Sequence, residues 1–159
     1  PKTDMSARLQ TLKGLLKPNG VIIIRDSDDG SKLAYATDEE NRNRKSLDSV
    51  LAMTDALQNV ADRHTGRKLS VLLHAADFKD VRVYSFMRDT SQMKSDQRKG
   101  LYDESFGWRL EVVEKEKGAE SQAYKVMKND LKKLKSLFLG SKSCFWYCEY
   151  DYIAVATAE

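Results

Sequence analysis

Several features that would point to particular classes of protein are missing from this 159-residue sequence. No apolar run approaches the roughly 18 residues that a membrane-spanning helix needs, and no signal peptide is visible. With only two histidines, His64 and His74, a zinc site with its usual four ligands is not expected, so we expect no bound metal. The sequence also contains no internal repeat and no low-complexity tract. We therefore expect a globular domain that is not in a membrane.

The two cysteines indicate the redox environment. Cys144 and Cys148 stand four residues apart in a segment that reads as a strand. Same-face residues at this spacing lie about 13 Å apart, which is too far for a disulfide. We expect packing thiols, a reducing compartment and a cytoplasmic location.

The charges are numerous but nearly balanced. Lys and Arg total 27 against 24 Asp and Glu, so the net charge is only +3. Charges of both signs alternate along the chain, which does not require a nucleic-acid partner. One cluster is basic and has helical spacing, and we interpret it as a solvated face that leaves phosphate or nucleic-acid binding as a minor alternative: Lys125, Lys128, Lys132, Lys133, Lys135 and Lys142.

Hydrophobic periodicity divides the sequence into helices, strands and loops. The predicted order is helix 4–16, strand 21–24, a loop over 25–43 with room for a turn of helix, helices 46–62 and 67–76, strand 81–86, a partly helical stretch 91–117, helix 120–138 and strand 145–157. The unbroken β-branched run from Val21 to Ile24 is typical of a sheet that is covered on both faces. These patterns predict an α/β fold with three strands in a single domain.

One segment carries a family resemblance. Leu16-Lys17-Pro18-Asn19-Gly20, followed by an apolar strand and Asp26, resembles the late L-K-P-G-G signature of class I S-adenosylmethionine-dependent methyltransferases. Asn19 replaces the first glycine of that signature, and Asn is the next-best residue for a positive φ. Residues 67–83 resemble the family's helix, corner and sixth strand, with Asp77 where glycine is usual. Residues 146–158 resemble its seventh strand.

The resemblance implies a fold, and it implies that the chain is one half of a larger domain. The chain would be the C-terminal half of a Rossmann-like methyltransferase sheet, with strand order 5-7-6 in family terms and the last strand antiparallel. Helices would flank the sheet, and residues 91–143 would be a helical insertion between the last two strands. All of residues 1–159 would belong to one domain.

The resemblance also implies a cofactor that this chain does not itself bind. In the family, S-adenosyl-L-methionine is held by the first half, through a glycine-rich loop after strand one and an acidic residue ending strand two. This chain has eight glycines but no G-x-G-x-G between a strand and a helix. We expect the intact protein to methylate an unidentified acceptor, and the isolated chain to lack both the cofactor site and activity.

Candidate substrate-binding residues follow the first strand. Open α/β sheets bind ligands at the carboxyl ends of their strands, which places Arg25, Asp26, Asp28 and Asp29 at the mouth of the expected site. A carboxylate there can orient an acceptor or take its proton. The alternative is a solvated acidic loop with turn hydrogen bonds. We interpret His64 as a histidine at a helix end, where the dipole favours its charge, and identify no catalytic residue.

Other functions and partners stay open at this stage. The chain could instead be an interaction or regulatory module that keeps the same back-half fold without chemistry. In either case the strand from Val21 to Ile24 would have an open apolar edge, because no fourth strand of the family is present to pair with it. Such edges pair with other chains, so we expect a homo-oligomer.

Overall fold

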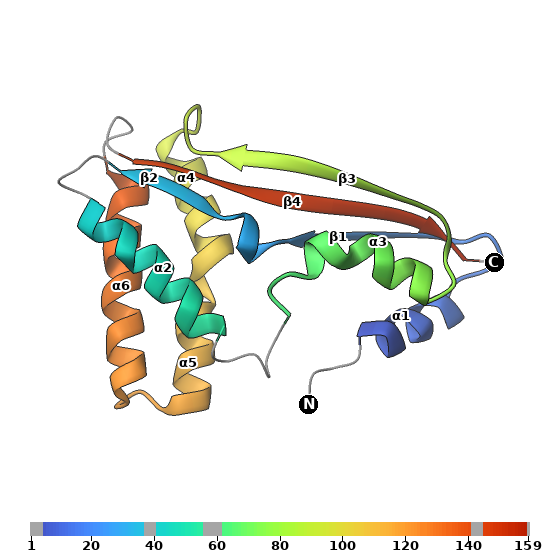
Figure 1. Cartoon of the computed structure of the whole chain (residues 1–159), viewed down its shortest axis with the longest axis horizontal. Coiled ribbons are helices and arrows are strands. Elements are labelled where there is room, and N and C mark those ends of the chain that lie inside the picture. Colours follow the sequence, from blue (N-terminus) through green and yellow to red (C-terminus); the bar gives the residue numbers. More distant parts are fainter. Residues whose placement is uncertain (1–4, 37–40, 56–61, 141–144, 159) are drawn as a thin grey trace. The chain divides into compact units, whose positions relative to one another are not determined.

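A computed structural model describes residues 5–36, 41–55, 62–140 and 145–158. The described part is a mixed α/β fold with a four-stranded antiparallel sheet and flanking helices (Figure 1). The strands are β1 (Val21–Ser27), β2 (Leu33–Ala36), β3 (Lys79–Asp89) and β4 (Phe145–Thr157). The α-helices are α1 (Met5–Gly14), α2 (Asn41–Asp55), α3 (Thr65–Ala75), α4 (Ser95–Tyr102), α5 (Arg109–Lys117) and α6 (Gln122–Leu139). A 3-10 turn, η1 (Asp29–Ser31), and a π-helical turn, η2 (Asp103–Gly107), complete the described elements.

The last strand, β4, organises the sheet. It pairs antiparallel with β1, from Val21 opposite Thr157 to Ser27 opposite Asp151. Its first residues pair antiparallel with β2, and β3 also pairs with β4. Each of the other strands therefore depends on β4 for its backbone hydrogen bonds.

Comparison with the sequence predictions confirms most elements and corrects one region. The helices expected at 4–16, 67–76 and 120–138 are α1, α3 and α6, and the strands expected at 21–24 and 81–86 are the longer strands β1 and β3. Within the loop predicted over 25–43, η1 agrees with the expected turn of helix, but the loop prediction missed the end of β1, the whole of β2 and the start of α2. The sheet accordingly has four strands where three were expected. Cys148 is buried in β4, whereas Cys144 lies outside the described residues.

Contacts divide the chain into two compact units. The first unit comprises Pro1–Lys32, Ala61–Arg88 and Glu149–Glu159, and the second comprises Leu33–Val60 and Asp89–Cys148. Each unit has its own hydrophobic core.

In the first unit, α1 and α3 contact each other and share one core with the sheet. The core residues are Leu9, Leu69, Leu73, Ala76, Phe78, Ala154, Ala156 and Ala158. Side chains alternate across β1, so Ile22 and Ile24 pack against this core while Val21 and Ile23 remain 56% and 68% exposed. The sheet of this unit thus buries one face and leaves apolar side chains on the other.

Two tight turns in the first unit require a left-handed backbone. Asn19, between α1 and β1, has φ 60°, and Asp77, after α3, has φ 59°. The Gly20 amide donates to Lys17 O at 2.7 Å, and the Phe78 amide donates to Leu73 O at 3.1 Å. Asn and Asp are the non-glycine residues that adopt this conformation most readily, which explains their presence at both corners.

In the second unit, helices enclose an aromatic core. Phe138 lies at its centre and contacts Tyr102, Phe106, Phe145 and Tyr147 at ring-centroid distances of 4.9–5.8 Å. Burial, with a smaller effect from Asp103, raises the pKa of Tyr102 to about 12. The apolar stripe predicted for residues 120–138 faces this core.

The lysines predicted to be solvated are exposed wherever the structure describes them, at 125, 128, 132, 133 and 135 on α6. None of the helices in the described ranges has the length and apolar character needed to cross a bilayer.

Candidate functional site

Five residues between β1 and β2 leave the sheet. Pairing of β4 with β1 ends at Asp151, and pairing with β2 begins at Cys148. Residues 28–32 therefore lie opposite only Glu149 and Tyr150, as in a wide β-bulge. We call residues 28–32 the excursion segment. Because the extra residues have no partners in the ladder, they leave the sheet. Their polar side chains then contact β4.

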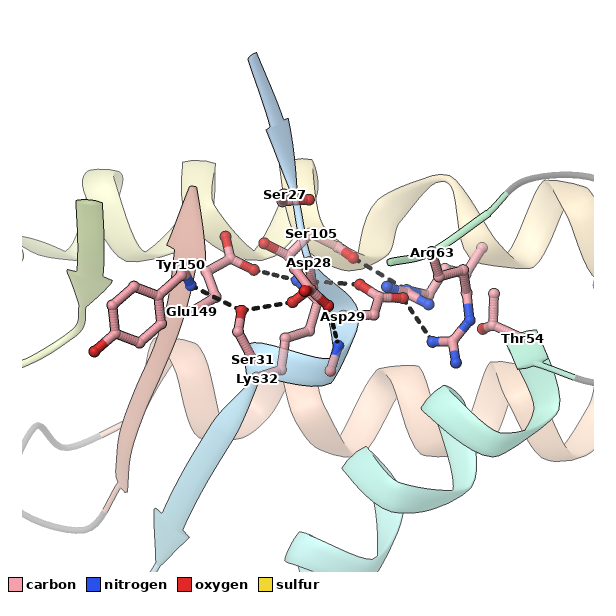
Figure 2. Close-up of polar contacts among 12 residues, drawn as sticks. Ser27, Asp28, Asp29, Ser31, Lys32, Thr54, Arg63, Ser105, Glu149 and Tyr150 are labelled. Carbon is pink, nitrogen blue, oxygen red and sulfur yellow. Dashed lines mark hydrogen bonds and ion pairs between the residues drawn. The ribbon is translucent and has the colours of Figure 1, made fainter. Parts of the chain in front are cut away.

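Hydrogen bonds hold the excursion segment in this shape. The Asp28 carboxylate accepts from the Gly30 amide at 2.8 Å and so caps η1. The Ser31 hydroxyl donates to Asp28 O at 2.5 Å, and the Tyr150 amide donates to the same hydroxyl at 3.0 Å (Figure 2). The segment is thus tied both to itself and to β4.

Buried ion pairs connect the excursion segment to Glu149 of β4 and to Arg63. Lys32 forms an ion pair with Glu149, and its ammonium also lies 3.3 Å from Asp29 (Figure 2). Arg63 donates to the second oxygen of Asp29 at 2.7 Å. The side chains of Lys32 and Glu149 are 1% and 0% exposed. Charges buried this deeply are tolerated in proteins only when they are paired and hydrogen-bonded.

The ion pairs continue along β4 to β1 and β3. Arg88 of β3 contacts both Glu149 and Asp151. Arg25 of β1 donates to Asp151 through two nitrogens, at 2.6 and 3.1 Å. Together with Lys32, Asp29 and Arg63, these residues form what we call the charge network.

A second carboxylate of the excursion segment binds the start of α3. Asp28 is fully buried and accepts from Arg67 through Nε and Nη2, while His64 Nδ1 lies 3.0 Å from its Oδ1. Burial alone would raise the pKa of Asp28, but hydrogen bonds from Arg67, His64 and the Gly30 amide outweigh it and lower the pKa below its usual value. Asp28 is therefore ionised and engaged.

Asp26 differs from its neighbours. It lies near the carboxyl end of β1 opposite Tyr152, and its carboxylate accepts from the Ser27 amide at 2.8 Å. Burial raises the pKa of Asp26, and the negative charges of Asp29, Asp62 and Asp151 raise it further. A raised pKa makes a carboxylate a better proton acceptor at neutral pH, so Asp26 is the acidic residue here best suited to proton transfer.

The four predicted site residues divide into separate environments. Arg25 and Asp26 are adjacent in β1, and their side chains therefore point to opposite faces of the sheet. Asp28 and Asp29 have the turn geometry expected of an acidic loop, but both are buried and ion-paired instead of solvated. His64 precedes α3 and lies at its N-terminal cap. Its ring contacts Asp28, and the end of the helix that we predicted before it lies outside the described residues.

Sequence reasoning missed the other charged residues that pair with the predicted ones or with each other: Lys32, Arg63, Arg67, Arg88, Glu149 and Asp151. One signal was available, since Glu149 and Asp151 interrupt an otherwise aromatic and aliphatic strand. A charged residue inside such a strand requires a buried partner. The identity of that partner depends on contacts between residues far apart in the sequence, such as Lys32 and Glu149.

The chemistry open to this arrangement is acid–base and electrostatic. Within the ranges that the structure describes, no three His, Cys, Asp or Glu side chains are grouped to hold a metal ion. The charge network can orient neighbouring groups, and Asp26 can accept a proton. A nucleophile poised beside a general base is not found among the described site residues.

Comparison with known proteins gives this chain no family. No known family matches the sequence, and no curated protein matches it. Among solved structures, the chain is similar to phosphoethanolamine N-methyltransferase 2 of Haemonchus contortus, determined in complex with phosphomonomethylethanolamine and S-adenosylhomocysteine. The TM-score is 0.40 and the identity 14%, over 98% of this chain and 30% of that chain. This chain thus spans about a third of that protein's length, and a likeness of this size assigns it neither an activity nor a ligand.

Proposed function

We propose that this chain is the C-terminal half of a class I methyltransferase sheet, and that the intact protein transfers a methyl group from S-adenosyl-L-methionine to an acceptor. The observation that carries the proposal is the pairing of the last strand. β4 pairs with both β1 and β3 and runs antiparallel to β1. That arrangement agrees with the order 5-7-6 that the sequence resemblance implies.

The two turns at positive φ give independent support. Asn19 and Asp77 occupy the two positions where the resembling family usually has glycine. Both adopt left-handed backbone conformations, with φ 60° and 59°. A position that needs such a conformation favours glycine, and Asn or Asp after it. The departures from the family's pattern therefore preserve its backbone geometry.

The open face of the first unit fits a half sheet. Strands in doubly wound sheets are covered by helices on both faces. Here α1 and α3 pack with one face, while Val21 and Ile23 on the other are exposed. A preceding half of the domain would supply the missing helices, together with the glycine-rich loop that holds the cofactor.

Within this chain, we assign the acceptor side of the site to the end of β1. Bound S-adenosylmethionine would supply an electrophilic methyl group, held by residues outside this chain. Asp26, with its raised pKa, would orient the acceptor or take the proton that it releases. Asp28 and Asp29 would fix the excursion segment through Arg67 and Arg63, and Arg25 would remain beside Asp151.

The test is the reading frame that contains this sequence. We expect it to encode an upstream strand, a glycine-rich loop and a helix. The full product should bind S-adenosylmethionine in isothermal titration calorimetry, and Asp26→Asn should lower its methyl transfer rate while cofactor binding is unchanged. The 159-residue chain alone should give no binding heat. Micromolar binding by this chain alone would refute the absence of the cofactor site.

The second candidate is a non-catalytic interaction module, and one observation favours it. Two deeply buried charges of the site, Lys32 and Glu149, are engaged with each other, as in a network that serves stability. An initiation codon directly before Pro1 and no upstream methyltransferase half would support this function. A full product that binds S-adenosylmethionine would exclude it.

A further inference from the structure

β3 is the most exposed strand of the described sheet. Eight of its eleven residues are exposed, including large apolar side chains on both of its faces: Val83, Tyr84, Phe86 and Met87. Within the described ranges β3 pairs with β4 alone, so its outer edge carries no strand (Figure 1). A long apolar edge of this kind is a template for pairing with another chain.

We propose that the outer edge of β3 pairs antiparallel with β3 of a second copy of this chain, about a two-fold axis at Tyr84. The two sheets would then join into one continuous sheet across the axis. Such an interface is isologous, because each residue i that faces residue j of the partner is matched by j facing i. The regular ladder would run from Val81 to Met87 in both copies.

The charges of β3 favour a second copy of β3 as its pairing partner. With Tyr84 facing Tyr84, the oppositely charged Asp80 and Arg88, and beyond them Lys79 and Asp89, come next to each other just outside the two ends of the ladder, where the backbone of Asp80 turns to φ 49°. Opposite charges in facing positions stabilise antiparallel pairs. Arg88 can keep its contacts with Glu149 and Asp151, and the added carboxylate of Asp80 would extend that charge network across the interface.

The interior of the ladder is equally self-complementary. Val81 faces Met87, Arg82 faces Phe86, and Val83 faces Ser85, so no charge faces a like charge. The Arg82–Phe86 pair allows a cation–π contact on each side of the axis.

Neighbouring registers are less favourable. Moving the axis to Ser85 places Arg82 opposite Arg88, which is repulsive. Moving it to Val83 places Asp80 opposite Phe86 and Lys79 opposite Met87, so neither charge faces an opposite charge of the second copy. The sequence of β3 therefore specifies one register of self-pairing.

The charges that face each other in self-pairing also distinguish β3 from β1. We expected residues Val21 to Ile24 of β1 to form the edge that pairs in an oligomer. Self-pairing of β1 about Ile24 places Ile23 opposite Arg25 and Ile22 opposite Asp26, with no pair of opposite charges. The charge pattern favours β3 as the edge that pairs.

The first experiment is analytical ultracentrifugation between about 1 and 100 µM. We expect a monomer–dimer equilibrium, and we expect Tyr84→Lys to raise the dissociation constant at least tenfold because two ammonium groups meet at the axis. Tyr35→Lys is the matched control, since Tyr35 is also an exposed strand tyrosine, 63% exposed in β2. It should leave the equilibrium unchanged. A monomer at every concentration would overturn the proposal.

The second experiment tests the register and does not depend on the folding of Tyr84→Lys. Residues directly opposite across antiparallel strands have Cβ atoms about 4.5–5.5 Å apart, near disulfide range. Tyr84→Cys should therefore cross-link to a covalent dimer under mild oxidation, whereas Tyr35→Cys and the wild-type chain should not. Arg82→Cys and Phe86→Cys should cross-link only when mixed. Equal cross-linking by Tyr35→Cys would overturn the register. Loss of the dimer in Ile23→Lys but not in Tyr84→Lys would assign the interface to β1.

Discussion

At the residue scale, two aspartates that are close in sequence respond oppositely to their surroundings. Asp28 accepts from Arg67 and His64, and its pKa is lowered despite burial. Asp26 is half-buried near other carboxylates, and its pKa is raised. The chain therefore contains one carboxylate that stabilises the fold when ionised and another whose ionisation opposes folding.

Paired substitutions to asparagine should separate these effects. Asp28→Asn removes the charge that Arg67 binds and should lower the free energy of unfolding at pH 7 by about 1–2 kcal/mol, near the low end for a charged hydrogen bond because half of the Arg67 side chain is exposed to screening solvent. Asp26→Asn keeps an acceptor for the Ser27 amide and removes an unfavourable charge. It should leave the stability at pH 7 unchanged or slightly higher in urea titrations.

Acidification should show the same contrast. Because the folded-state pKa of Asp28 is below its ordinary value, its contribution is complete above about pH 4 and is lost as the pH falls through the lowered pKa. The stability difference between wild type and Asp28→Asn should therefore shrink below about pH 4 in thermal melts. A difference that stays constant down to pH 2 would contradict the role assigned to the Asp28 charge.

Gly66 illustrates how one missing side chain lets α3 approach β1. A Cβ at Gly66 would lie 2.6 Å from Tyr152 Cδ2 and 3.0 Å from Ser27 O, and the second of these is backbone. Gly66→Ala should therefore destabilise the chain by about 1–3 kcal/mol in urea unfolding, as overpacked sites do. Gly100→Ala is the helical control, since nothing lies within 4 Å of its Cβ, and it should be neutral or stabilising. Equal effects of the two substitutions would refute a close approach at Gly66.

At the element scale, the excursion segment shows where sequence reasoning succeeds and where it stops. Helices such as α6 follow from local periodicity, so their positions could be predicted. β2 is only four residues long, and its strand conformation comes from pairing with β4, far along the chain. The acids Asp28 and Asp29 were visible in the sequence, but their burial depends on Arg63, Arg67 and the excursion over β4. Non-local contacts of this kind leave no periodic signal.

Because the excursion segment is held by buried charges, single and double substitutions should behave differently. Glu149→Gln removes the carboxylate that pairs with both Lys32 and Arg88 and leaves Asp29 as the counter-charge of the buried Lys32 ammonium, so it should cost about 1.5–3 kcal/mol in the free energy of unfolding. The double variant Lys32→Met/Glu149→Leu removes both charges and should be more stable than Glu149→Gln. Urea unfolding of the three chains measures both differences. A double variant less stable than Glu149→Gln would show that the Lys32–Glu149 pair itself stabilises the segment.

At the scale of the whole molecule, the exposed side of β1 connects the fold to the proposed function. Ile23 is 68% exposed, whereas its neighbour Ile24 packs against the core with α1 and α3. A half sheet has one uncovered face that the rest of its domain would bury, while a stand-alone module has no such requirement. The two proposed functions therefore differ in what they demand of Ile23.

Ile23→Thr and Ile24→Thr form the corresponding test, because threonine preserves the β-branch that favours a strand. In the 159-residue chain, Ile24→Thr should cost on the order of 1–3 kcal/mol from lost apolar burial, and Ile23→Thr should stay within about 0.5 kcal/mol of wild type. In the full product of the reading frame, a methyltransferase half would cover Ile23, so Ile23→Thr should become as costly as Ile24→Thr. If Ile23→Thr is silent in both proteins, nothing covers that face, and the interaction module is the function that the fold supports.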